Sequence, residues 1–264
     1  MSKLIKTLTE AKLSFGFENA KLGGTGAYTF SVPAGKTCPG ACDCLAHVVE
    51  ATKIVDGEVK PTYRIVDGKK QKFRCFAASM EVRSPSVYRS RKRNLGLIMA
   101  AGGVEQISEL IYNSLPPRAT IVRVHVGGDF FSESYFLAWM EVARRSPHIE
   151  YYAYTKSNPT WVKYMALVPK NFVLTASRGG RHDHLIDKHN LKEALVVYHP
   201  EEADALNLQI DHDDSLAKNP KVKKFALLIH SMGKAGSRHN EAMARMRREG
   251  IKHGYRKEDP VNAL

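Results

Sequence analysis

The chain has 264 residues, 43% of them hydrophobic and 25% charged, so it can bury a sizeable core and has the composition of a globular protein. Its formal net charge is +13, an excess that would attract polyanions such as nucleic acid. No apolar run approaches the roughly 20 residues of a membrane helix, and residues 1–20 lack the continuous apolar core of a secretory signal, which predicts a cytoplasmic protein that does not enter a membrane.

The first predicted strand, residues 27–32, leads into a loop that holds three of the four cysteines in the chain. Cys38, Cys42 and Cys44 follow the pattern C-x3-C-x-C, and the fourth thiol is Cys75. In a reducing compartment, clustered thiols are more often metal ligands or catalysts than disulfides. Structural zinc sites usually use C-x2-C pairs, whereas uneven spacing with a distant fourth ligand suits an iron–sulfur cluster. We therefore expect all four cysteines to hold one [4Fe–4S] cluster, with zinc, or with unligated structural or redox cysteines, as the alternatives.

The middle of the chain begins with an insertion and continues with helices. Residues 48–72, with two Val-Asp-Gly turns, predict a β-hairpin or an irregular insertion between the cysteine motif and Cys75. Residues 78–100 predict a long helix that Pro85 interrupts or restarts. Residues 104–115 carry their apolar residues on one face, as an amphipathic helix does.

Five more β-branched runs follow, each ending in a small or polar turn. These runs cover residues 119–126, 149–155, 171–177, 194–199 and 225–231. Helical patterns separate most of them; Ser134 is expected to cap the first of these helices, and Ser237 the last. Alternating strands and helices predict parallel strands joined by right-handed crossovers. We expect one α/β domain over residues 1–264, built as an open doubly wound sheet or as a full or partial (β/α) barrel of the TIM type.

Polar residues stand where these strands end. In both architectures, function gathers at the carboxyl ends of the strands. Gly127, Gly128 and Asp129 follow one strand, and we expect the carboxylate of Asp129 to contact a ligand. Lys156 and Ser157 follow the next strand, where the lysine could neutralise a phosphate, a carboxylate or a cluster.

Two further motifs carry charge. Arg178 and Arg181 flank a Gly-Gly pair, so two guanidinium groups and backbone N–H groups could meet one anion, such as nucleic acid or a nucleotide-like ligand. Residues 211–214, Asp-His-Asp-Asp, are acidic enough for a hard cation but are better explained as a solvated turn.

The three-cysteine loop and the later strand ending in "VGGDFF" resemble the start of the radical S-adenosylmethionine (radical SAM) barrel. The resemblance implies a cluster held by three cysteines, with one iron open to S-adenosylmethionine. It also implies that Gly127, Gly128 and Asp129 meet the amino group of that cofactor. Cys75, as a fourth ligand, would close the open iron.

A second resemblance covers most of the chain. The stretches "FRCFAASMEVRSPSVYRSRKRN" and "VRVHVGGDFFSESYFLAWMEVARRSP", with the cysteine loop and "YAYTKS", are similar to the phage gene product 88 family. This implies a phage origin and the cytoplasm of the host cell, and it supplies no reaction. The expected function is an iron–sulfur protein with a basic surface that binds nucleic acid or another anion. The alternatives are an active radical SAM enzyme and a zinc-stabilised nucleic-acid-binding protein; the oligomeric state stays open.

Overall fold

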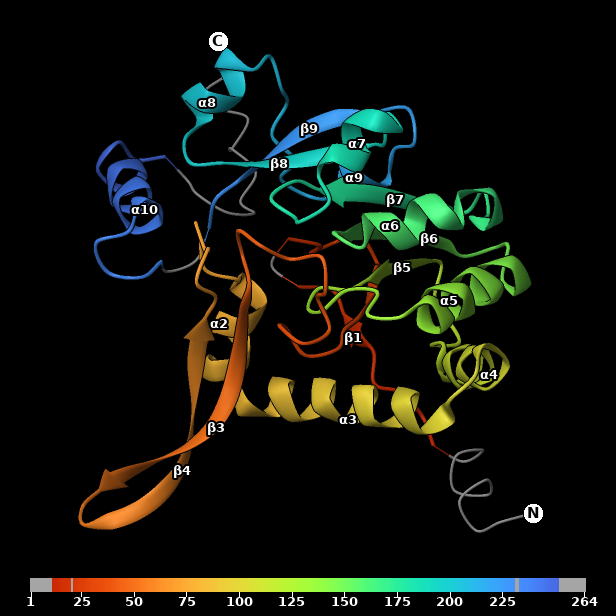
Figure 1. Ribbon diagram of the computed structural model, residues 1–264, viewed down its shortest axis with the longest axis horizontal. Coiled ribbons are helices and arrows are strands. Elements are labelled where there is room, and N and C mark those ends of the chain that lie inside the picture. The colour runs from red at the N-terminus through yellow and green to blue at the C-terminus, as the bar shows by residue number, and fades with distance from the viewer. Residues whose placement is uncertain (1–10, 20, 231–232, 252–264) are drawn as a thin grey trace.

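A mostly parallel seven-stranded sheet forms the centre of a mixed α/β fold (Figure 1). The computed structural model describes residues 11–19, 21–230 and 233–251. The strands of the sheet are β1 (Gly16–Phe17), β2 (Tyr28–Phe30), β5 (Ile121–Val124), β6 (Glu150–Thr155), β7 (Phe172–Ser177), β8 (Glu193–Val197) and β9 (Lys224–Leu228).

From β5 onward the helices alternate with the strands along the chain, as the sequence pattern predicts. The helices are α2 (Phe76–Arg83), α3 (Pro85–Ala101), α4 (Val104–Ser114), α5 (Glu133–Arg145), α6 (Asn158–Lys163), the 3-10 turn η1 (Met165–Leu167), α7 (His184–Lys188), α8 (Pro200–Ala205), α9 (Ser215–Lys218) and α10 (Arg238–Arg248). Pro85 starts α3, so the predicted break of the long helix is confirmed. The predicted cap at Ser134 is wrong: the side chain of Ser132 accepts the bond from the Tyr135 N–H. The cap predicted at Ser237 is confirmed.

The order of the strands distinguishes between the two expected architectures. The order is β1-β2-β5-β6-β7-β8-β9, and every pair from β2 to β9 is parallel. A doubly wound sheet reverses its strand order at a switch point. These six parallel strands instead follow one another in chain order. β1 and β9 form the two edges, so the part of the chain that the structure describes contains an open sheet and no closed barrel.

The two faces of the sheet differ in chemistry. Successive side chains of a strand point to opposite faces. On one face, Val122, Tyr151 and Leu174 belong to the main apolar core together with Ile111 of α4 and Trp139 of α5. The opposite face carries a buried Arg123 from β5 and two tyrosines from β6, and α9 packs over β6 and β7.

The insertion is a long antiparallel hairpin, β3 (Ala46–Val55) and β4 (Glu58–Asp67), which extends away from the body of the protein (Figure 1). Its turn holds Asp56 and Gly57 at φ values of 54° and 80°, the left-handed conformation that a two-residue hairpin turn requires. The predicted hairpin is therefore confirmed, over residues 46–67.

Over the described residues, the structure has no helix that combines the length and the apolar character needed to cross a membrane.

Candidate functional site

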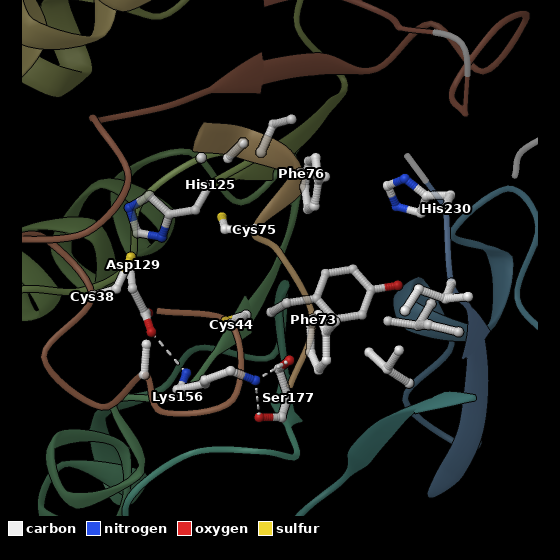
Figure 2. Close-up of a pocket in the computed structure, with 18 of the residues that line it drawn as sticks. Cys38, Cys44, Phe73, Cys75, Phe76, His125, Asp129, Lys156, Ser177 and His230 are labelled. Carbon is white, nitrogen blue, oxygen red and sulfur yellow. Dashed lines mark hydrogen bonds between the residues drawn. The ribbon is translucent and has the colours of Figure 1, made fainter. Parts of the chain in front are cut away.

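The loops that follow the strands meet around one cavity of about 190 Å³ (Figure 2). Cys38 and Cys44 come from the loop after β2, Asp129 from the loop after β5, Lys156 from the end of β6 and Ser177 from the end of β7. The carboxyl ends of parallel strands share one edge of a sheet, which is why these distant segments converge.

The cysteine loop is fixed by backbone hydrogen bonds to two other segments. The N–H of Asp43 donates to the carbonyl of Gly179 at 2.9 Å, and the N–H of Arg181 donates to the carbonyl of Gly40 at 2.8 Å. The N–H of Lys72 donates to the carbonyl of Asp43 at 2.8 Å, just before the chain reaches Cys75. The last of these bonds brings the segment that leads to Cys75 back beside the cysteine loop.

Gly40 allows the cysteine loop to lie directly on the end of β6. A Cβ atom on Gly40 would lie 2.0 Å from the carbonyl oxygen of Lys156, which no side chain could tolerate. The glycine is therefore required by the approach of two backbones.

Three of the four cysteines line the cavity, namely Cys38, Cys44 and Cys75. Cys42 is not among the described residues of its wall, so the expected set of four is brought together only in part. All four are free cysteines at partly buried positions. We call Cys38, Cys44 and Cys75 the thiol side of the cavity.

Burial keeps the thiol side protonated. Burial, and to a lesser extent the neighbouring Cys44, raise the pKa of Cys75 to about 12, although backbone N–H groups of Ala78 and Ala77 at the start of α2 oppose this. Burial, followed by Asp129, raises the pKa of Cys38, and burial raises that of Cys44 although Lys156 opposes it. Deprotonation of these thiols is therefore disfavoured in the protein alone, and a cation bound beside them would favour it.

A single metal ion has no ready site in this arrangement. Among the described residues, no three histidine, cysteine, aspartate or glutamate side chains form a group that could hold one ion. The three thiols face a shared space but do not converge as the ligands of one zinc ion do.

The Gly127–Gly128 turn is explained by packing within the protein. A Cβ atom on Gly127 would lie 2.4 Å from the guanidinium of Arg91, and one on Gly128 would lie 2.3 Å from Val32. Gly128 also has a φ of 83°, which favours glycine. Arg91 itself is buried and ion-paired with Glu81 at 2.7 Å, so it is not part of an exposed basic patch.

Asp129, Lys156 and Ser157 are buried, and their hydrogen bonds connect the loops that follow β5, β6 and β7. The carboxylate of Asp129 accepts from the Thr155 hydroxyl at 2.6 Å, and from the N–H groups of Phe130 and Lys156 at 2.7 Å each. Lys156 Nζ donates to Ser177 Oγ at 2.7 Å, to the Ser177 carbonyl at 2.6 Å and to the Arg178 carbonyl at 3.0 Å. The hydroxyl of Ser157 donates to the Phe130 carbonyl at 2.7 Å. These side chains line or adjoin the cavity as expected, and their contacts join β5, β6 and β7; ligand binding by them stays a prediction.

The two arginines predicted to bind an anion contact the protein itself. Arg178 pairs with Asp187 at 2.7 Å and also with Glu193. Arg181 Nε donates to the carbonyl of Ala41 at 3.2 Å. Binding of nucleic acid or of a nucleotide-like anion by this pair stays a prediction, and it would have to compete with two carboxylates.

A buried group of charges at the same cavity was not expected. Asp214 accepts from Lys21 Nζ at 2.6 Å and from Arg123 at 2.7 Å, and the hydroxyls of Tyr152 and Tyr154 each donate to it at 3.0 Å. We call these five residues the ionic cluster. Burial opposes ionisation of Asp214, but Arg123 and Lys21 outweigh it and lower the pKa to about 2. The solvated turn predicted at residues 211–214 is therefore wrong: Asp211 and Asp214 are both buried.

From the sequence, His125 is expected to be a packed histidine rather than a base, and the structure buries it in the cavity wall with a φ of 71°. Two signals were available in "IVRVHV": a charged Arg123 within an apolar strand, and a histidine that only Val126 separates from the Gly-Gly turn.

Comparisons with known proteins agree with the second resemblance. No curated protein and no solved structure matches the chain. The family described as Gene product 88 matches residues 3–249, nearly the whole sequence. The chain therefore belongs to the gene product 88 family.

Proposed function

We propose that this protein binds an iron–sulfur cluster in its cavity through Cys38, Cys44 and Cys75. One observation carries the proposal: three thiols, from two segments separated by a long hairpin, line the same cavity at the carboxyl edge of a parallel sheet. Cytosolic thiols gathered in this way are more often metal ligands than disulfides.

The spread of the thiols favours a cluster over a single zinc ion. In a cluster each iron takes its own cysteine, so the protein ligands surround a polynuclear core and do not meet at one point. A [4Fe–4S] cluster with these three ligands would have one iron without a cysteine.

The rest of the cavity wall suits a group that must be kept from water. Phe73, Phe76, Leu227 and Ile229 contribute apolar surface to the same cavity wall. A hydrophobic shell limits solvent access and affects the reduction potential of such a group. Because burial raises the pKa values of the three thiols, loading should release protons and become tighter as the pH rises.

The test is iron and sulfide analysis of protein purified or reconstituted without oxygen, together with absorbance near roughly 400 nm, where sulfide-bridged iron absorbs. We expect Cys38→Ala, Cys44→Ala and Cys75→Ala each to lose most of the iron. Cys42→Ala is the matched control, because it removes a thiol from the same loop but not from the cavity wall. Colourless wild-type protein with one zinc per chain, or equal iron in all four variants, would contradict the proposal.

A radical SAM activity is the second candidate. Two observations favour it. The parallel strands follow one another in chain order, and three cysteines, the number that hold the cluster in that superfamily, line the cavity. One observation counts against it. The resemblance implies that Asp129 contacts the amino group of S-adenosylmethionine, but this carboxylate already accepts three hydrogen bonds within the protein. Addition of S-adenosylmethionine to reduced, iron-loaded protein should change the electron paramagnetic resonance spectrum if it binds the open iron.

A further inference from the structure

His125 is held in an uncommon backbone conformation at the end of β5. Its φ is 71°, in the left-handed region that residues with a side chain rarely adopt. Its N–H and that of Val126 both donate to the Phe30 carbonyl, at 3.0 and 3.1 Å. Such strained residues persist where the surroundings hold them, and they gather at functional sites.

The imidazole is buried, with one nitrogen bonded and the other not. Its residue is 4% exposed, and the ring packs edge-on against Phe130 with centroids 4.7 Å apart. Nε2 lies 2.8 Å from the Tyr135 hydroxyl. Nδ1 has no hydrogen-bond partner among the described residues. A buried polar atom without a hydrogen-bond partner is destabilising, so the structure leaves a need for a partner at this nitrogen.

The chemistry of the ring determines what Nδ1 can offer. Burial lowers the pKa of His125 to about 3, so the imidazole is neutral and carries a hydrogen on one nitrogen. Tyr135 is fully buried, and donation of its hydroxyl hydrogen to Nε2 leaves that hydrogen satisfied. The imidazole hydrogen then lies on Nδ1, which becomes a donor.

This donor belongs to the wall that carries the thiols. His125, Cys38 and Asp129 all line the cavity, and Figure 2 shows them on the same side of it. The carboxylate of Asp129 is already engaged by Thr155, Phe130 and Lys156. Nδ1–H therefore needs another acceptor, and a sulfur atom of the proposed iron–sulfur cluster could provide it.

We propose that His125 is a positioning and tuning residue: its Nδ1–H donates to a sulfur of the cluster and raises the reduction potential. This inference rests on the proposed function. Hydrogen bonds to cluster sulfurs are among the factors that set the potential, because they stabilise the reduced, more negative form. Tyr135 acts through His125 by fixing the hydrogen on Nδ1.

The test compares reduction midpoints, measured by anaerobic titration with dithionite, in iron-loaded wild type, His125→Phe and Tyr135→Phe. We expect His125→Phe to shift the midpoint to a more negative potential at unchanged iron content. Tyr135→Phe should give a smaller shift in the same direction, because the imidazole can then change tautomer. His199→Gln is the control: this histidine caps α8, lies outside the cavity wall and should leave the midpoint unchanged.

The two proposals fail in different ways. Fully loaded His125→Phe protein with the wild-type midpoint would overturn the role of His125 and leave the cluster in place. Wild-type protein without iron and sulfide would overturn the proposed function itself. If His125→Phe does not fold, Tyr135→Phe decides, because it keeps the histidine and removes one hydroxyl.

Discussion

The ionic cluster and the thiol side border the same cavity but differ in whether their polar groups are paired within the protein. In the ionic cluster, Asp214 lies within 2.7 Å of two cations that are themselves buried. On the thiol side, Cys38, Cys44 and Cys75 are free, and Nδ1 of His125 has no hydrogen-bond partner among the described residues. The first region holds the fold together with its own charges, whereas the second has donors and ligands that a bound group would use. Mutations should therefore lower stability in the first region and loading in the second.

The largest effect is expected where the ionic cluster is broken. Asp214→Asn removes the negative charge that is paired with the buried Lys21 and Arg123, and we expect the free energy of unfolding to fall by roughly 3–5 kcal/mol. Urea denaturation measures this. Asp204→Asn, at an exposed position of α8, should change it by no more than about 0.5 kcal/mol. A loss below about 1 kcal/mol for Asp214→Asn would mean that the cluster contributes little.

The same cluster should make the protein sensitive to acid. The folded-state pKa of Asp214, about 2, lies below its ordinary value of 3.8. Its stabilising contribution is thus complete above about pH 4 and is lost as the pH falls toward 2, a change of about 2 kcal/mol. Unfolding free energies of wild type and Asp214→Asn, measured over this range, should approach each other at low pH. A constant difference would refute the assignment.

A glycine exchange tests the contact between the cysteine loop and β6. Gly40→Ala forces a Cβ atom against the Lys156 carbonyl, and we expect a loss of roughly 1–3 kcal/mol together with lower iron content. Gly96→Ala is the matched control in the middle of α3, where an added Cβ meets nothing within 4 Å. It should stabilise the protein by roughly 0.5–1 kcal/mol, because alanine favours a helix more than glycine does. Equal effects of the two exchanges would show that the loop can move away from β6.

The smallest effect is expected at the surface, outside both regions. Lys92 of α3 pairs with Glu50 of the hairpin at 2.8 Å, and both side chains are exposed. Lys92→Gln should lower the free energy of unfolding by less than about 1 kcal/mol, and added salt should remove the difference. Urea denaturation measures this difference. A larger loss of unfolding free energy, or one that salt does not remove, would contradict the prediction and show that this ion pair stabilises the contact between α3 and the hairpin.

Much of the sheet could be predicted because the strands are marked locally. Six β-branched runs became six parallel strands, and Asp-Gly at residues 56–57 marked the hairpin turn. The helix cap predicted at Ser134 lies at Ser132, because both serines precede the same apolar pattern and only the backbone geometry distinguishes them.

The site could be predicted only where its residues follow strands directly. The positions of Asp129 and Lys156 at the cavity follow from the rule that loops after parallel strands share an edge. Which cysteines face the cavity depends on the bonds of Asp43 to residues 72 and 179, which no local pattern encodes. The burial of Asp214 likewise depends on Lys21 and Arg123, partners far away along the chain.

The hairpin between Cys44 and Cys75 begins and ends at one place, since Ala46 and Asp67 are paired across its base. The length of this arm can therefore vary without changing where the chain re-enters the cavity wall. Asp56 and Gly57 lie at its far end, where inserted residues are best tolerated. An affinity tag or fluorescent label placed there would report on the protein from a distance while the cysteine loop keeps its geometry.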